Sequence, residues 1–137
     1  MRAMTHHDVI IIGGGQAAAS VGYFLRRTSR SFLILDAEEG PGGAWRHGWQ
    51  SLHLFSPAIW SSLAGWPMPA TAHRFPALDQ VIDYLTRYEE RYDLPVRRPV
   101  LVESIESSDH GLIVRSGSDT WHAQAVVSTT GNWRNRW

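Results

Sequence analysis

Residues 9–18 read Val-Ile-Ile-Ile-Gly-Gly-Gly-Gln-Ala-Ala, and this stretch decides the fold. The apolar run 9–12 is typical of a central parallel strand that is buried on both faces and covered by helices. The three glycines after it permit a tight turn, and the residues that follow favour a helix. Such a helix begins with unpaired N–H groups and a partial positive charge, which together attract phosphate. The stretch therefore predicts a dinucleotide-binding strand, turn and helix.

Three small residues in this unit answer separate physical demands. Gly13 permits the tight turn, and Gly15 lets the backbone come close to a pyrophosphate. Ala18 takes the third small position, where the helix packs against the strand. We expect the helix over 16–27, and Gly22 inside it indicates close packing, because glycine costs a helix about 1 kcal/mol relative to alanine.

A second apolar run at 32–35 predicts the next strand, which ends at Asp36. This acid lies about 20 residues beyond the glycines, where a carboxylate would accept hydrogen bonds from a ribose 2′-hydroxyl. A glycine pattern alone is a weak signal, but strand, glycines, helix, strand and acid in this order form a specific one. The alternative is a glycine-rich turn without a ligand, with Asp36 as a solvated strand end.

Length and charge narrow the classes of protein to which the chain can belong. The 137 residues, 43% of them hydrophobic, suit one domain with its own core. The formal net charge is zero, so no overall field recruits nucleic acid or an anionic membrane, and neither partner is expected. We assign the basic clusters to a helix end and to solvated loops: Arg26-Arg27, Arg97-Arg98, and Arg134 with Arg136.

The absence of cysteine excludes disulfides, thiolate metal sites and a redox pair of cysteines, so any redox chemistry needs a bound cofactor. The seven histidines lack the helical spacing of a metal site, so no metal is expected. For His47 and His53, which flank the Trp-rich loop, we favour surface or loop-packing roles over contact with a ligand. No signal peptide or membrane-length apolar run is visible, which predicts a soluble cytoplasmic protein. We expect residues 1–7 to be a disordered lead to one domain at 8–137.

Beyond Asp36 the periodic pattern stops for several dozen residues. Residues 38–75 are rich in Gly, Pro, Ser and Trp, and irregular segments of this length are usually functional or disordered. Large aromatic side chains need partners to pack on, so the tryptophans of this segment argue against disorder: Trp45, Trp49, Trp60 and Trp66.

An amphipathic helix follows over 78–92, where apolar residues recur at helical spacing. Tyr84, Tyr88 and Tyr92 lie four residues apart on it. They form either a binding ridge or a packed face, and we favour the packed face.

Short strands complete the chain. One is expected at 95–96, and turn compositions separate three strands of an antiparallel meander. A last apolar strand runs into Thr130-Gly131. The meander strands and the last strand are expected at 100–105, 112–115, 120–123 and 125–129.

Taken together, the glycine turn, Asp36, the loop Gly42-Gly43-Ala44-Trp45, the meander and the turn at Thr130-Gly131 resemble the N-terminal part of NAD(P)H-dependent flavin monooxygenases. This group contains the flavin-containing monooxygenases and the Baeyer–Villiger enzymes. The resemblance extends from about residue 8 to the end of the sequence. It implies an α/β fold: a Rossmann-like FAD/NAD(P)-binding domain with a parallel sheet and a three-stranded antiparallel meander.

The resemblance also implies FAD as the bound dinucleotide and assigns its contacts. By this resemblance the pyrophosphate loop comprises Gly13, Gly14, Gly15, Gln16 and Ala17, and the ribose acid is Asp36. Ala44 and Trp45 form a second pair of contacts, and Val102 contacts adenine through its backbone. One departure concerns Phe55-Ser56, because many flavin-containing monooxygenases carry Asn-Ser at these positions beside the flavin ring. An amide there could donate a hydrogen bond, whereas Phe55 can only pack. No catalytic residue is assigned.

Enzymes of this group use NADPH or NADH as co-substrate and O2 to oxygenate a small-molecule substrate. Thr130-Gly131 resembles a turn that, in these enzymes, leads into an NADPH-binding domain. A segment that returns to the flavin follows that domain. Neither follows before Trp137, so we expect a truncated FAD-binding domain. Two alternatives stay open: a non-catalytic FAD- or dinucleotide-binding fragment, and an NAD-dependent dehydrogenase domain with a meander insert, against which residues 42–45 argue.

Overall fold

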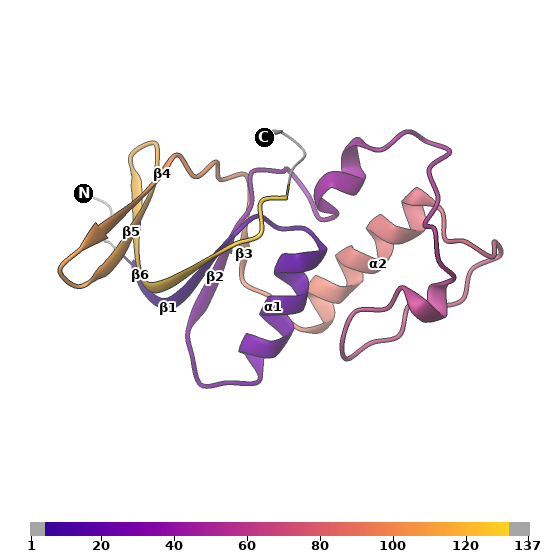
Figure 1. The fold of residues 1–137 in the computed structure, drawn as a ribbon, viewed down its shortest axis with the longest axis horizontal. Coiled ribbons are helices and arrows are strands. Elements are labelled where there is room, and N and C mark those ends of the chain that lie inside the picture. Colours follow the sequence, from indigo (N-terminus) through magenta and orange to yellow (C-terminus); the bar gives the residue numbers. More distant parts are fainter. Residues whose placement is uncertain (1–4, 132–137) are drawn as a thin grey trace.

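The computed structural model describes residues 5–131, which form one mixed six-stranded sheet with two α-helices (Figure 1). The strand order across the sheet is β3-β2-β1-β6-β5-β4. Strands β3, β2, β1 and β6 are parallel, and β6, β5 and β4 are antiparallel. This arrangement is the predicted Rossmann-like α/β fold with its meander. The elements are β1 (Thr5–Ile12), α1 (Gln16–Arg26), β2 (Phe32–Leu35), η1 (Gly43–His47), η2 (Ala58–Trp60), α2 (Leu78–Arg91), β3 (Val96–Arg97), β4 (Ser104–Ser108), β5 (Gly111–Ser116) and β6 (Asp119–Ser128).

Strand β1 is buried on both faces, as its unbroken apolar run predicts. Val9 and Ile11 belong to a core that both helices share with the sheet, and α1 and α2 lie on the same side of the strands (Figure 1). Ile10 and Ile12 belong to a second core on the other face. The sequence predicted that helices cover this strand, and among residues 5–131 this prediction is wrong for the second face. There Val114 of β5 and Trp121 and Ala123 of β6 pack in the second core.

Gly22 lies where α1 packs most closely, which confirms the prediction from its place in the helix. A Cβ atom at this position would lie 3.1 Å from Leu94 and 3.4 Å from Ile34. Ala18, the small residue one turn earlier, is 1% exposed. Small residues thus let the helix approach the sheet closely.

The start of the sheet differs from the expected disordered lead over residues 1–7. Thr5, His6 and His7 already belong to β1, where they pair with Trp121, His122 and Ala123 of β6. The long partner strand supplies hydrogen bonds to these polar residues, which have no strand pattern of their own. Residues 1–4 of the expected lead lie outside the described part of the chain.

The meander also differs in its bounds. The expected strands at 120–123 and 125–129 are one continuous strand, β6, which pairs with β5 along its first half and with β1 along nearly all of its length. Residues 100–103 are not in a strand, because Val100 donates its N–H to Asp36 at 2.7 Å and turns toward the end of β2 instead. Strand β4 therefore begins only at Ser104.

The tyrosines of α2 form a packed face, as favoured from the sequence. Tyr84 and Tyr88 are 2% and 0% exposed, and both bind the loop that crosses the helix. The Tyr88 hydroxyl donates to the carbonyl of Ala64 at 2.5 Å, and the ring of Trp66 stacks on Tyr84 with centroids 5.0 Å apart. The irregular segment is thus anchored from beneath, although Trp49 and Trp60 at its surface are exposed. No helix among residues 5–131 is long and apolar enough to cross a membrane.

A candidate dinucleotide-binding cleft

A cleft of about 580 Å³ opens beyond the carboxyl ends of the parallel strands. Its wall includes the last residue of β1, the residues at the end of β2 and the turn after β6. Ligands of open α/β sheets bind at this edge, where successive strands lie to either side of the first. The volume falls within the range of about 300–1,000 Å³ that is usual for small-molecule sites.

The residues assigned to cofactor binding come together at this cleft, with one exception. Those that line it are Gly13, Gly15, Gln16, Ala17, Asp36, Ala44, Trp45 and Val102. Gly14 does not line it. A Cβ atom on Gly14 would lie 2.4 Å from the carboxylate of Asp36, so glycine is needed there to seat the acid.

The other glycines of the turn have different roles. Gly13 has a φ of 99°, and its Cβ atom would lie 2.5 Å from the carbonyl oxygen of Thr129, so the turn permits no side chain. Gly15 has an ordinary φ of −87°, and the nearest atom to its Cβ position is the Cα of Gly43 at 3.6 Å. Protein packing therefore does not demand a glycine at position 15. Its open side fits a ligand that approaches the backbone closely.

Helix α1 begins at the cleft without a cap. Gly15 is its N-cap residue, no side chain accepts a hydrogen bond from its first turn, and this turn contains no acidic residue. Gln16 and Ala17, the first helical residues, line the cleft. The first N–H groups of a helix have no partner within it, and together with the helix dipole they favour an anion. This end of the cleft thus fits a pyrophosphate.

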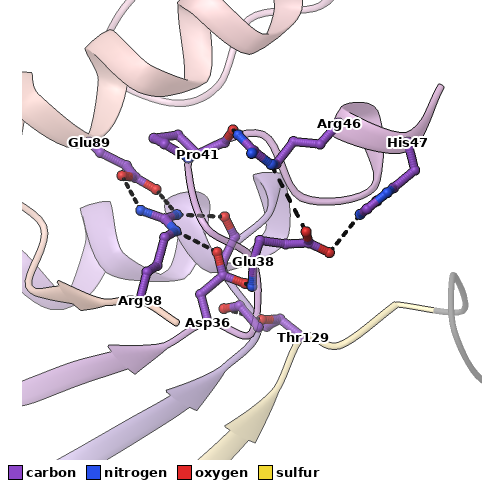
Figure 2. Close-up of polar contacts among 10 residues, drawn as sticks. Asp36, Glu38, Pro41, Arg46, His47, Glu89, Arg98 and Thr129 are labelled. Carbon is purple, nitrogen blue, oxygen red and sulfur yellow. Dashed lines mark hydrogen bonds and ion pairs between the residues drawn. The ribbon is translucent and has the colours of Figure 1, made fainter. Parts of the chain in front are cut away.

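Asp36 is 3% exposed and is not a solvated strand end. Its Oδ2 accepts a hydrogen bond from Arg98 Nε at 2.6 Å, and its Oδ1 accepts one from the backbone N–H of Glu38 at 3.3 Å (Figure 2). Its place at the cleft agrees with the predicted ribose acid, because a carboxylate oxygen can accept a second hydrogen bond.

Arg98 is not in a solvated loop, so our assignment of Arg97-Arg98 is wrong for this residue. Its side chain is 12% exposed, and its guanidinium contacts Asp36, Glu89 and the carbonyl of Gly14. Burial opposes its charge, but hydrogen bonds to Glu89 and Asp36, together with their negative charges, outweigh burial and raise the pKa of Arg98. The residue missed from the sequence therefore stays charged behind the cleft.

Glu38 is a second acid at the cleft that sequence reasoning missed. Its carboxylate accepts a hydrogen bond from His47 Nε2 at 2.8 Å and lies 3.9 Å from Arg46 Nε (Figure 2). These contacts tie η1 to the residues after β2. His47 is thus a packing residue of the loop, as expected, and His53 contacts the carbonyl of Ser51 at 2.8 Å.

Trp45 connects the irregular loop to α1, because its indole Nε1 donates to the side chain of Gln16 at 3.2 Å. Phe55 is 93% exposed and does not line the cleft. No group of three or more His, Cys, Asp or Glu side chains among residues 5–131 is placed to hold a metal ion.

The sheet, the glycine turn and the cleft define a Rossmann-like dinucleotide-binding domain. A sequence profile of the pyridine nucleotide-disulphide oxidoreductase family matches residues 10–136, and the chain belongs to this family.

Curated relatives share this sequence over part of their length. An uncharacterized oxidoreductase, CzcO, of Bacillus velezensis is 30% identical over 125 residues, which cover 91% of this chain and 36% of the relative. A CzcO-like oxidoreductase of Geobacillus kaustophilus is 33% identical over 124 residues, which cover 90% of this chain and 36% of the relative. The chain thus spans little more than a third of the curated relatives that it matches.

Solved structures confirm the resemblance to flavin monooxygenases. A flavin-containing monooxygenase from Stenotrophomonas maltophilia is 53% identical, with a TM-score of 0.91 over 93% of this chain and 39% of that protein. A steroid monooxygenase bound to NADP shares the fold, with a TM-score of 0.85 and 22% identity over 93% of this chain and 26% of that protein. The chain is therefore similar to flavin-dependent oxidoreductases and matches their N-terminal part.

Proposed function

We propose that this chain is the FAD-binding portion of a flavin-dependent monooxygenase that uses NAD(P)H and O2 to oxygenate a small-molecule substrate. The observation that carries the proposal is the convergence of the open Gly15, the uncapped start of α1 and the held Asp36 on one cleft. The 53% identity to a flavin-containing monooxygenase supports it.

The residues around the cleft fit FAD in a definite order. Backbone N–H groups at 15–17 would bind the pyrophosphate, and Asp36 would accept hydrogen bonds from the adenosine ribose. Val102 would contact adenine through its backbone. When bound, FAD supplies the capacity to accept hydride and to react with O2, which no side chain of this protein possesses.

The protein's own contribution is to bind and orient the cofactor. Trp45, held by Gln16, would shield the cleft from water on the side of η1. Glu38, held by His47, keeps η1 against the end of β2. We assign no general acid or base, because the bound cofactor would supply the chemistry.

A methyl group at Gly15 tests the cleft with little effect on the fold. Alanine is compatible with the φ of −87°, and its nearest neighbour would be 3.6 Å away. The methyl group would stand where the pyrophosphate must approach, so we expect Gly15→Ala to weaken FAD binding about tenfold or more, by displacing charge-assisted hydrogen bonds. Flavin absorbance and titration calorimetry with FAD on the purified protein measure this.

The matched control is Gly117→Ala in the turn between β5 and β6. A Cβ atom there would meet nothing within 4 Å, and the φ of 57° gives only a backbone strain of about 1–2 kcal/mol. This variant should bind FAD as the unchanged protein does. If Gly15→Ala also binds FAD as tightly as the unchanged protein, the assignment of the cleft to FAD is wrong.

Turnover distinguishes the monooxygenase from its alternatives. Oxidation of NADPH by the FAD-loaded protein, with oxygen from O2 incorporated into a small substrate, would support the proposal. Oxidation of NADPH without any oxygenated product would favour another flavin-dependent oxidoreductase. Bound FAD without any NAD(P)H oxidation, in a protein that carries this chain at the full length of its relatives, would favour the non-catalytic binding unit.

A further inference from the structure

Arg98 holds together groups from three parts of the fold behind the cleft. Its Nε donates to Asp36 at 2.6 Å, and its two terminal nitrogens donate to Glu89 of α2 at 2.9 and 2.5 Å. One of these nitrogens also donates to the carbonyl of Gly14 at 3.3 Å. The geometry to Glu89 is bidentate, the arrangement in which arginine binds a carboxylate most strongly. Figure 2 shows the guanidinium between Glu89 and Asp36.

The cluster has a net negative charge. One arginine and two carboxylates sum to −1, and the side chains are 12%, 5% and 14% exposed for Arg98, Asp36 and Glu89. Salt screens such buried charges much less than it screens charges in water. An anion that approached Asp36 from the cleft would therefore be repelled.

The guanidinium of Arg98 could have attracted this anion, but it is bound within the cluster. In dinucleotide-binding folds, an arginine near the ribose accommodates a 2′-phosphate, whereas an acid accepts a hydrogen bond from a 2′-hydroxyl. Here the arginine is present, but Glu89 occupies both of its terminal nitrogens. Asp36 Oδ1 accepts a long bond of 3.3 Å from the N–H of Glu38, and a carboxylate oxygen can accept a second hydrogen bond, here from a hydroxyl.

From this arrangement, and given FAD binding as proposed above, we infer that Glu89 is a specificity-determining residue. By holding Arg98, it makes the adenosine end of the cleft accept a free ribose 2′-hydroxyl and exclude a 2′-phosphate. Glu89 acts through Arg98 and Asp36 and is thus a positioning residue. In an enzyme that uses both FAD and NADPH, this cluster keeps the phosphorylated dinucleotide out of the FAD cleft.

The test compares two probes that differ only in the 2′-phosphate. ADP-ribose and 2′-phospho-ADP-ribose are titrated against the FAD-loaded protein at fixed ionic strength, and displacement of FAD is followed by flavin fluorescence. We expect the unchanged protein to bind ADP-ribose about tenfold or more tightly than its 2′-phosphate. In Glu89→Gln the cluster becomes neutral and Arg98 loses one of its two charged partners, so the ratio of the two affinities should fall by about fivefold or more.

Two further variants separate selectivity from structure. Glu90→Gln removes the same charge from an exposed neighbour on α2 and should leave the ratio unchanged. Glu89→Asp keeps the charge but shortens the side chain, so it should keep most of the selectivity, whereas a merely structural role would suffer as much as in Glu89→Gln. If Glu89→Gln does not fold, Arg98→Lys decides, because lysine keeps the positive charge but cannot bind Glu89 in the bidentate geometry, and this variant must also bring the two affinities closer together.

Three results would overturn the inference about Glu89, and the first of them would also overturn the proposed function. If the unchanged protein binds neither FAD nor ADP-ribose, the proposed function fails and this inference falls with it. If it binds both but does not discriminate against the 2′-phosphate, the inference alone is overturned. Equal ratios in Glu89→Gln and Glu90→Gln would also overturn it.

Discussion

Tyr84→Phe should loosen the loop that crosses α2, because one hydroxyl ties both ends of a short turn to the helix. The Tyr84 hydroxyl accepts a hydrogen bond from the N–H of Leu63 at 2.9 Å and donates one to the carbonyl of Trp66 at 2.6 Å. Leu63 and Trp66 also form an isolated antiparallel bridge with each other. Phenylalanine retains the ring and its stacking and removes only these two hydrogen bonds.

The expected loss of stability follows from the loss of these two hydrogen bonds. A hydrogen bond contributes about 0.5–1.5 kcal/mol net, so two contribute about 1–3 kcal/mol. Leu63 and Trp66 are half-buried, and water can replace part of the loss, which favours the lower half of that range, about 1–2 kcal/mol. For a domain of this size about 1 kcal/mol corresponds to about 4 °C in Tm, so we expect a decrease of about 4–8 °C.

Thermal unfolding followed by circular dichroism measures the shift, and urea unfolding checks the free energy. The control is Tyr92→Phe, which makes the same change at the C-cap residue of the same helix, at a hydroxyl with no hydrogen-bond partner among the described residues. It should change stability by less than about 0.5 kcal/mol. Equal shifts in Tyr84→Phe and Tyr92→Phe would refute the reasoning.

The other predictions concern the turn, the alkaline limit and the surface of the loop. Gly13→Ala should cost more than about 3 kcal/mol in urea unfolding, because its Cβ would meet a backbone oxygen at 2.5 Å at a φ of 99°; a stable, folded variant would contradict this. Burial, and then its neighbouring tyrosines, raise the pKa of Tyr88 above 10.0. In the unfolded chain Tyr88 therefore ionises at a lower pH than in the folded protein, so its contribution to stability is complete below about pH 10 and falls above it. Tyr88→Phe should flatten this fall in a pH series of melts. Phe55→Asn should leave Tm within about 2 °C, since this side chain is 93% exposed, and a larger decrease would show that the ring packs in solution.

Local signals predicted the part of the fold that forms the cleft. The apolar run before Gly13, the helix after it and the strand that ends at Asp36 depend on neighbours in sequence, and periodicity reports such neighbours. The conformation of Gly13 and the open side of Gly15 also follow from their positions in the turn. Most of the predicted site therefore lines one cleft.

Contacts between distant segments were not predictable in this way. Arg98 lies 62 positions beyond Asp36 and beside Pro99, so its basic cluster reads as a loop, and only the folded chain brings both acids to it. His6 and His7 have no strand pattern and are ordered by a strand that follows more than a hundred residues later. In both cases tertiary pairing overrides a weak or misleading local preference.

The joint between β1 and the end of β6 has a consequence for synthesis of the protein. Thr129 donates hydrogen bonds from its N–H and its hydroxyl to the carbonyl of Ile12, each at 2.8 Å, across 117 positions of sequence. At about 5–20 residues per second, a ribosome needs roughly 6–23 s to add the second partner after the first. Throughout that interval at least one edge of β1 has no partner strand, and such an edge can pair wrongly with another strand. The turn at 129–131 lines the cleft, so this wall of the cleft is complete only after residue 129 has been translated.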